Sequence, residues 1–308
     1  MKALSELLLS TNGLTKQYGH HKAVDKVNLH IKKGAIYGFI GRNGAGKTTC
    51  LKMISGLARP TAGEIEMFGC KGKELERIRS RVGCLIEAPG LYGNMNAYTN
   101  LKIKCELFGI RKKGYIEDIL ETVGLEGVGK KKTKHFSLGM KQRLGIGLAL
   151  VGEPDLLVLD EPINGLDPQG IAEVRDTIQR LRDERNMTIL ISSHILEELS
   201  KIATDYGIIH NGSLLQELTS EELMKRCSER IEIELIHPEQ AVPILDRMGF
   251  TNYQVTDKSH IHIFEPLNKS ANVNMELAKA GILVNGISIT SEELETYFLN
   301  LTGGNQNA

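Results

Sequence analysis

A glycine-rich segment, residues 41–49, carries residue types that suit phosphate binding. The apolar residues 35–40 before it predict a buried strand, and residues 49–54 after it predict a helix. In such a turn, successive backbone N–H groups and the helix N-terminus surround a phosphate chain. We expect Lys47 to reach the outer phosphates and the Thr48 hydroxyl to face a magnesium ion. A glycine-rich structural turn is the alternative interpretation. The residues expected to contact the nucleotide are Gly41, Asn43, Gly44, Gly46, Lys47, Thr48 and Thr49.

Two acidic residues follow a second apolar run. Residues 156–159 predict a central parallel strand buried on both faces, and Asp160 and Glu161 stand at its carboxyl end. Ligands of open α/β sheets bind at that end of the strands. We therefore expect Asp160 to hold Mg²⁺, usually through water, and Glu161 to polarise the water that attacks the γ-phosphate. The alternative is a pair of solvated carboxylates at a strand end.

A histidine follows the next apolar strand, which we predict at residues 187–193. His194 would then lie at the same sheet edge as Asp160 and Glu161. It could hydrogen-bond the γ-phosphate and hold the attacking water, which makes it a third candidate catalytic residue beside Glu161 and Lys47. The alternative is a helix-capping or surface histidine.

A second candidate anion cradle begins at Ser137, which stands where the N-cap of a helix running to about residue 151 belongs. Gly139 would allow a ligand to approach the backbone closely. The signal is weak when taken alone, because most serine-capped helices bind nothing.

Tyr18 lies in the loop expected between strands at residues 7–16 and 28–31. Its ring could stack on a nucleotide base, since stacking is nearly indifferent to the identity of the base. An ordinary edge-strand tyrosine is the alternative.

The remaining patterns indicate an α/β protein with two domains, residues 1–220 and 221–308. A helical, polar-faced block at about residues 88–152 would form a lobe inserted between strands of the first domain. The pattern of the second domain predicts the order strand–helix–strand–strand–helix–strand, which is the order of a ferredoxin-like unit. The predicted strands are 231–235, 253–255, 260–264 and 287–290, and the helices are 238–248, 273–280 and 291–301, the last capped by Ser291. His260 and His262 share a strand face there, but no third metal ligand follows them in register.

Composition narrows the functional class. The 308 residues include 38 Lys plus Arg and 38 Asp plus Glu, so no overall charge favours a nucleic-acid partner. The five cysteines show no metal-ligand spacing, and we expect reduced thiols in a cytosolic protein. Because no apolar stretch approaches the ~20 residues that span a bilayer, work at a membrane would require a partner.

Six motifs in this order resemble the ATP-binding subunit of an ABC transporter, over about residues 7–218. The phosphate loop is the first of the six. It is followed by Glu87 at the Q-loop, Ser137 and Gly139 in the signature, Asp160 and Glu161 at the Walker B end, Asp167 in the D-loop and His194 as the switch histidine. Ahead of these six, Tyr18 matches the adenine-stacking aromatic. The resemblance implies a P-loop NTPase core, ATP as substrate and Mg²⁺ as its metal, with Thr48, Glu87 and Asp160 near the ion.

The same resemblance implies two kinds of partner. Two ATPase subunits, as a homodimer or a heterodimer of paralogues, would pack head-to-tail and trap two ATP molecules, the signature of one covering the phosphate loop of the other. The helical lobe would dock on an integral-membrane permease at the cytoplasmic face of the cell membrane. The second domain is interpreted as an accessory that is structural or clamps the dimer.

Two departures from the family pattern point to a subfamily. The usual Leu-Ser-Gly-Gly-Gln signature is replaced by residues 136–140, in which Met140 cannot make the hydrogen bonds of a glutamine. Glu87 replaces the Q-loop glutamine. A carboxylate binds magnesium more strongly than an amide oxygen does, but it places a second negative charge near Glu161. Both resemble the exporters that confer resistance to bacitracin and lantibiotics.

Three other functions remain open at this point. They are another ABC exporter or importer, a non-transport ABC ATPase such as a translation factor or DNA-repair machine, and a P-loop kinase or GTPase. The single phosphate loop and the absence of heptads and cysteine pairs count against the second. The signature helix and terminal histidine count against the third.

Overall fold

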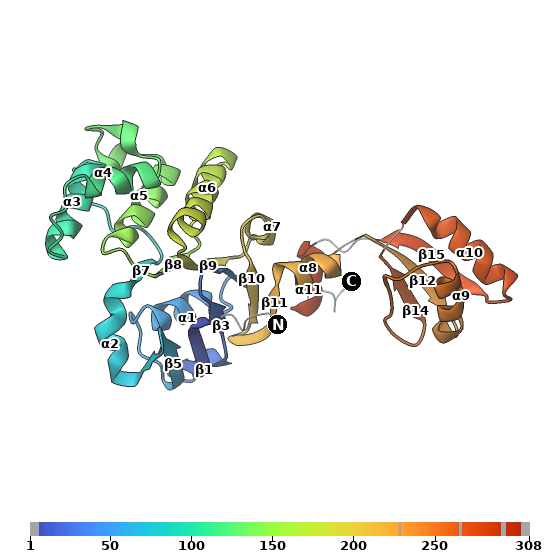
Figure 1. Cartoon of the computed structure of the whole chain (residues 1–308). Helices are drawn as coiled ribbons and strands as arrows, with labels where there is room; N and C mark the ends of the chain where they lie inside the picture. Colours follow the sequence, from blue (N-terminus) through green and yellow to red (C-terminus); the bar gives the residue numbers. More distant parts are fainter. Residues whose placement is uncertain (1–5, 228, 265–266, 291–293, 303–308) are drawn as a thin grey trace. The chain divides into compact units, whose positions relative to one another are not determined.

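The computed structural model describes residues 6–227, 229–264, 267–290 and 294–302. The chain divides into two compact units, residues 1–220 and 221–308 (Figure 1). Each unit is built around its own sheet and its own hydrophobic core.

A six-stranded sheet forms the centre of the first unit, in the order β11-β10-β4-β9-β8-β7. Its strands run parallel except β11, which pairs antiparallel with β10. The three central strands β4, β9 and β8 are buried along their whole length, as expected of apolar runs covered on both faces. The strands are β4 (Ile36–Ile40), β7 (Val82–Leu85), β8 (Leu156–Asp160), β9 (Thr188–Ser193), β10 (Asp205–His210) and β11 (Ser213–Thr219).

A second, antiparallel sheet packs in the same unit, in the order β2-β1-β5-β6 with β3 also pairing β1. Helix α1 (Lys47–Ile54) joins it to the six-stranded sheet, since Cys50, Leu51 and Met53 share one core cluster with residues of both. The strands are β1 (Leu7–Tyr18), β2 (His21–Val27), β3 (His30–Lys32), β5 (Ala62–Met67) and β6 (Cys70–Lys71).

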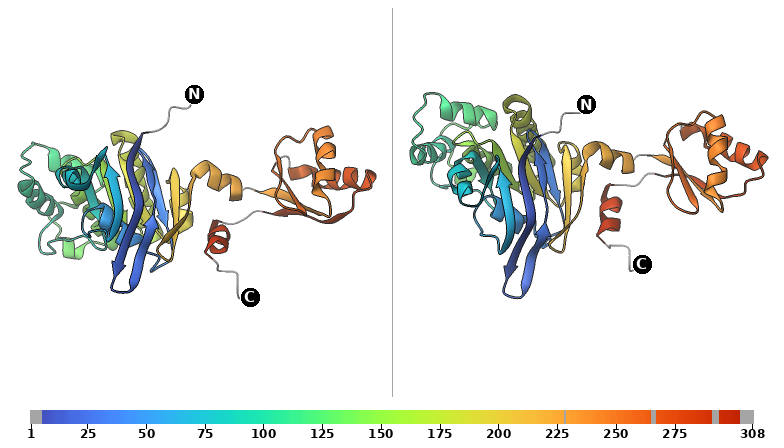
Figure 2. Two further views of the ribbon diagram at one scale, coloured as in Figure 1. Left: turned by 90° about the horizontal axis from the view of Figure 1, so that it is seen from below. Right: turned by 60° about the horizontal axis from the view of Figure 1, so that its bottom comes forward.

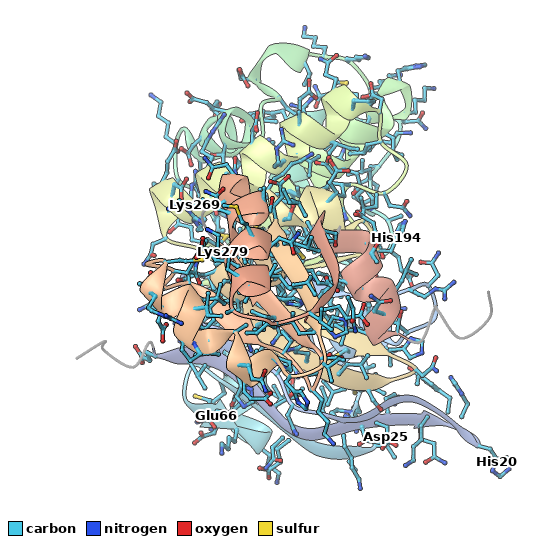
Figure 3. The ribbon with its side chains drawn as sticks, turned by 90° about the vertical axis from the view of Figure 1, so that its right-hand side faces the viewer. His20, Asp25, Glu66, His194, Lys269 and Lys279 are labelled. Carbon is cyan, nitrogen blue, oxygen red and sulfur yellow. The ribbon has the colours of Figure 1, made fainter. Side chains whose placement is uncertain are left out.

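The position of Tyr18 differs from the prediction. Residues 7–18 form one long strand that pairs with β2 in a hairpin, and Tyr18 ends that strand opposite His21 (Figure 2). The turn holds His20, labelled in Figure 3. The prediction of a loop here was wrong because β2 carries charged residues on its exposed face, which obscured its alternation.

The predicted helical lobe lies between β7 and β8. In Figure 1 its three helices gather away from β1 and β5. They are α3 (Ala97–Leu107), α4 (Tyr115–Thr122) and α5 (Leu138–Leu150). The other helices of this unit are α2 (Leu75–Ile78), α6 (Pro168–Arg185) and α7 (Leu196–Ser200).

Helix α6 begins at Pro168, directly after a capping aspartate. The Asp167 carboxylate accepts a hydrogen bond from the Gly170 backbone N–H at 3.2 Å and caps the helix, and Pro168 stands at its first position. Proline suits that position because its missing N–H would have no partner there anyway.

The second unit has the strand order β13-β14-β12-β15, with every neighbouring pair antiparallel. Apolar residues of β12 and β14 face helices α9 and α10 across one core. This order confirms the ferredoxin-like prediction. The elements are β12 (Arg230–Leu235), α9 (Val242–Arg247), β13 (Tyr253–Val255), β14 (His260–Ile263), α10 (Ser270–Lys279) and β15 (Val284–Thr290), with α8 (Ser220–Cys227) at the boundary of the units and α11 (Leu294–Leu301).

Two details of this unit differ from expectation. Residues 238–248 form a 3-10 turn followed by α9, because Pro243 near the start of α9 has no N–H to continue a single helix. Lys269 precedes α10 and Lys279 ends it (Figure 3), so that helix begins three residues before the predicted 273. The predicted cap at Ser291 lies outside the described residues.

Candidate functional site

Four neighbouring parallel strands end at one edge of the six-stranded sheet, and each is followed by predicted site residues. In the order β4-β9-β8-β7, these are the glycine-rich loop 41–49, then His194, then Asp160 with Glu161, then Glu87. The sequence separation is large: Thr48 and Asp160, which touch, are 112 residues apart. Parallel strands place their carboxyl ends together, so the topology alone gathers these groups.

The glycine-rich loop has a backbone that side chains would disturb. Gly46 has φ 107°, and a Cβ there would lie 2.4 Å from the Ala23 carbonyl oxygen. Gly44 has φ 81° with open space around it. The loop is anchored by the Gly212 N–H, which donates to the Ala45 carbonyl at 2.9 Å. Helix α1 starts at Lys47, so its first N–H groups, which have no partner within the helix, belong to this loop.

Lys47 is the buried cation of the site, with only 5% of its surface exposed. Its ammonium donates to the carbonyl oxygens of Gly41 at 2.6 Å and Arg42 at 3.3 Å. It also lies 3.0 Å from Oε1 of Glu161. A buried ammonium must be paired, and here the loop carbonyls and one carboxylate supply the partners.

Asp160 is held by two hydroxyl groups. Thr48 Oγ1 donates to one carboxylate oxygen at 2.8 Å, and Ser192 Oγ donates to the other at 2.6 Å. The aspartate is buried, and its position in the strand is opposite Ser192 in the β8–β9 ladder. Hard oxygen groups from Thr48 and Asp160 therefore converge, which is the donor chemistry that Mg²⁺ prefers.

Glu161 has an unusual backbone and two charged neighbours. Its φ of 50° lies in the left-handed region, which non-glycine residues occupy rarely. Its second carboxylate oxygen lies 2.8 Å from Nδ1 of His194, the histidine labelled in Figure 3. Glu161 is therefore held between the cation of Lys47 and the ring of His194.

Glu87 forms an ion pair with Lys52, which stands four residues after Thr48 on α1. The hydrogen bond from Lys52 to the Glu87 carboxylate raises the pKa of Lys52 above its usual value. The charges of Glu87, Tyr18 and Asp160 act in the same direction. Glu87 also has a left-handed backbone, with φ 67°.

Among the described residues, three other predicted sets form no hydrogen bond or ion pair with these strand-end groups. Ser137 caps α5 as predicted, its hydroxyl accepting from the Met140 N–H at 3.2 Å. Within the described residues, no hydrogen bond joins residues 137–140 to the loop 41–49. Asp167 serves as a helix cap, and Tyr18 is 52% exposed, with the Lys16 ammonium 5.0 Å from its ring centre.

Two residues of the site were missed from the sequence. Ser192 was available as a polar residue near the end of a mostly apolar strand, two residues before the candidate His194. Lys52 had a weaker signal, its spacing of four from Thr48, which places both on one helix face.

An apolar groove lies between the helical lobe and the sheet edge, with a volume of about 370 Å³. Leu107 at its rim is 79% exposed, and Leu57 and Phe108 are also exposed. The groove is lined by Leu57, Cys84, Leu85, Ile86, Ala88, Pro89, Gly90, Tyr92, Asn100, Ile103, Lys104, Leu107, Phe108, Gly145 and Leu148.

Known proteins are similar to this chain in both fold and sequence. A model of the ABC transporter family matches residues 24–164. The chain is 45% identical over 299 residues to the bacitracin transport ATP-binding protein BcrA of Bacillus licheniformis, covering 96% of this chain and 98% of that protein. It is 44% identical over 211 residues to the lantibiotic transport ATP-binding protein SrtF of Streptococcus pyogenes, covering 68% and 90%. A solved ATP-binding subunit of an ABC transporter superposes with a TM-score of 0.62 at 29% identity, covering 71% of this chain and 92% of that one.

The fold and the site define a P-loop ATPase cassette. The chain belongs to the ABC transporter family, as one of its ATP-binding ATPase subunits, and the predicted resemblance is confirmed. In the part of the chain that the structure describes, no helix is both long enough and apolar enough to cross a bilayer.

Proposed function

We propose that this chain hydrolyses ATP at the β4-β9-β8-β7 edge and thereby energises a membrane exporter of antimicrobial peptides such as bacitracin or lantibiotics. The observation that carries the ATPase site is the convergence of the glycine-rich loop, Asp160, Glu161 and His194 on four adjacent strand ends. The peptide substrate class rests on the names of the relatives.

Each residue has a role that its chemistry supports. The loop N–H groups and Lys47 bind the phosphates of ATP, and Tyr18 stacks on its base. Thr48, Asp160 and Glu87 would hold Mg²⁺, which neutralises phosphate charge when bound. Glu161 accepts the proton of the attacking water as general base, and His194, hydrogen-bonded to Glu161, orients that water and the γ-phosphate.

The site is completed by a second subunit, either another copy of this chain or a paralogue. Support comes from the signature itself: Ser137 is exposed at the start of α5, its neighbour Leu138 is 46% exposed, and neither is bonded to the loop of its own chain. Ser137, Gly139 and Asp167 of one subunit would face the loop of the other.

Mixing two inactive variants of this chain tests the shared site for a homodimer. Lys47→Ala destroys the phosphate loop and Ser137→Arg blocks the signature, so each variant alone should lose ATPase activity. A mixed dimer contains one site with both defects and one intact site, so mixing should restore activity. If the mixture stays as inactive as its components, the hypothesis that two copies of this chain share each ATP site is refuted.

The apolar groove is the proposed docking site for the permease at the cytoplasmic face of the membrane. An exposed leucine beside an exposed phenylalanine indicates a surface that a partner covers. Leu107→Glu should abolish co-purification with the permease and leave basal ATPase activity unchanged. The matched control is Leu215→Glu on β11, at a leucine that is 43% exposed and outside the groove. Retained co-purification of Leu107→Glu would refute docking here.

Transport is tested in cells that carry this chain with its permease. Expression should raise resistance to bacitracin or a lantibiotic, and Glu161→Gln should remove that resistance while the permease level stays constant. Unchanged sensitivity to both peptides would refute the peptide exporter while leaving the ATPase assignment intact.

A further inference from the structure

Three acidic residues of the site would repel the negatively charged phosphates of ATP unless their charge is compensated. Asp160, Glu161 and Glu87 follow neighbouring strands β8 and β7 at the edge that ATP would approach. Asp160 is hydrogen-bonded by two hydroxyls, and Glu161 is paired with Lys47. The charge of Glu87 is compensated neither by those hydroxyls nor by Lys47.

Lys52 supplies the compensation for Glu87. Thr48 and Lys52 lie four residues apart and so share one face of α1, on which the Thr48 hydroxyl bonds Asp160 and the Lys52 ammonium bonds Glu87. One helix face therefore contacts the ends of both β8 and β7. The Lys52 and Glu87 side chains are 32% and 65% exposed, so their pairing adds little to folding stability.

Glu87 and Glu161 stand at equivalent positions beyond two neighbouring strands. In the β7–β8 ladder Leu85 pairs with Leu159, and two residues beyond each of these stand Glu87 and Glu161. Both glutamates have left-handed backbones, with φ 67° and 50°. In this conformation the Glu87 carboxylate is paired with the Lys52 ammonium.

We propose that Lys52 is a positioning residue that makes a glutamate usable at position 87. It holds the Glu87 carboxylate at the face of α1, while Glu161 is paired with Lys47, so that ATP enters a site without an uncompensated third negative charge. This inference rests on the proposed ATP site and deepens it, since it explains how the chain accommodates a carboxylate in place of the usual glutamine.

The test measures ATP binding in excess EDTA, so that neither metal binding nor turnover contributes. The chain has no tryptophan, so a fluorescent ATP analogue reports the dissociation constant. Lys52→Met should weaken binding about twofold to fivefold, the range expected for one charge of a partly exposed pair. In the Glu87→Gln background the same Lys52→Met change should have little effect, and Lys52→Arg should bind as the wild type does.

Two outcomes overturn the proposal. An equal loss from Lys52→Met in both backgrounds means that Lys52 acts on the phosphates directly, and no loss in either means that it has no role. Lys71→Met is the matched control, because Lys71 pairs with Glu66 on β5 and lies outside the site. Equal thermal unfolding midpoints of all variants exclude misfolding.

Failure of the proposed ATP site gives a different result. If Lys47→Ala leaves binding of the analogue intact, the phosphate loop is not the ATP site and the role of Lys52 falls with it. If binding depends on Lys47 while the Lys52 effect is equal in both backgrounds, only the role of Lys52 is refuted.

Discussion

Both units of the chain bring histidines close to carboxylates, but only one of them builds a site. In the first unit His194 and Glu161 meet at 2.8 Å beside a buried lysine and a phosphate loop. In the second unit His262 faces Glu232 at 3.7 Å across β14 and β12, and His260 bonds Asp257 at 3.0 Å. The residue types are nearly the same in the two places.

The difference lies in the sheets. Ends of parallel strands gather loops and a helix N-terminus around one point, where N–H groups remain available for a ligand. On the face of an antiparallel sheet, side chains form cross-strand pairs while the backbone groups bond their neighbouring strands. Among the described residues, no group of three or more histidines, cysteines or carboxylates could hold a metal ion. Glu232 on β12 does lie in register with His262, a cross-strand pairing that the pattern along the strand of His260 and His262 does not show.

Glu161→Gln should show the largest effect. Removing a general base commonly costs ~10²–10⁴ in rate, so ATP turnover should fall at least about 100-fold while ATP binding persists. The measurement is phosphate release at saturating ATP, with binding of the fluorescent analogue as control. If the variant keeps its turnover, the pair of Glu161 and His194 has no catalytic role, like the histidine–carboxylate pairs of the second unit.

Removal of the second unit should have an intermediate effect. Every contact of the proposed ATP site lies within residues 1–220, so a chain truncated after residue 220 should bind ATP within about twofold of the full chain. If the second unit clamps the dimer, ATP-dependent self-association should weaken in sedimentation experiments. Unchanged self-association would refute the clamp, and lost ATP binding would refute the functional separation of the units.

His260→Ala should have the smallest effect, confined to pH dependence. The hydrogen bond to Asp257 raises the pKa of His260 above its usual 6.5, so its contribution to stability is complete below pH 6.5 and is lost as the pH rises through the raised value. Backbone hydrogen bonding from Ser259 and the His260 contact lower the pKa of Asp257 from 3.8 to about 2, so its contribution is lost as the pH falls towards 2.

The measurement compares thermal unfolding of the wild type and His260→Ala at pH 5.5 and 8.5. The difference between the two proteins should shrink at the higher pH, while ATPase activity stays the same in both. A difference that grows with pH contradicts the pairing of His260 with Asp257.

Local patterns predicted much of this molecule. The glycine-rich loop, the buried strands that end at Asp160 and Ser193, and the serine cap of α5 were all visible as short runs. Tyr18 was misplaced because the alternation of β2 is weak. Lys52 was missed because a lysine on a helix gives no local signal of the strand end that it contacts.

The sequence by itself determined the residue types of the site and the elements that carry them, because strand, turn and helix preferences act over a few neighbouring residues. Only the tertiary structure decided the order β4-β9-β8-β7, which brings Thr48 to Asp160, Glu161 to Lys47 and Glu87 to Lys52. Strand order depends on hydrogen bonds between segments far apart in the sequence, such as β4 and β9, in which Ile36 pairs with Ile189, and no local pattern encodes it.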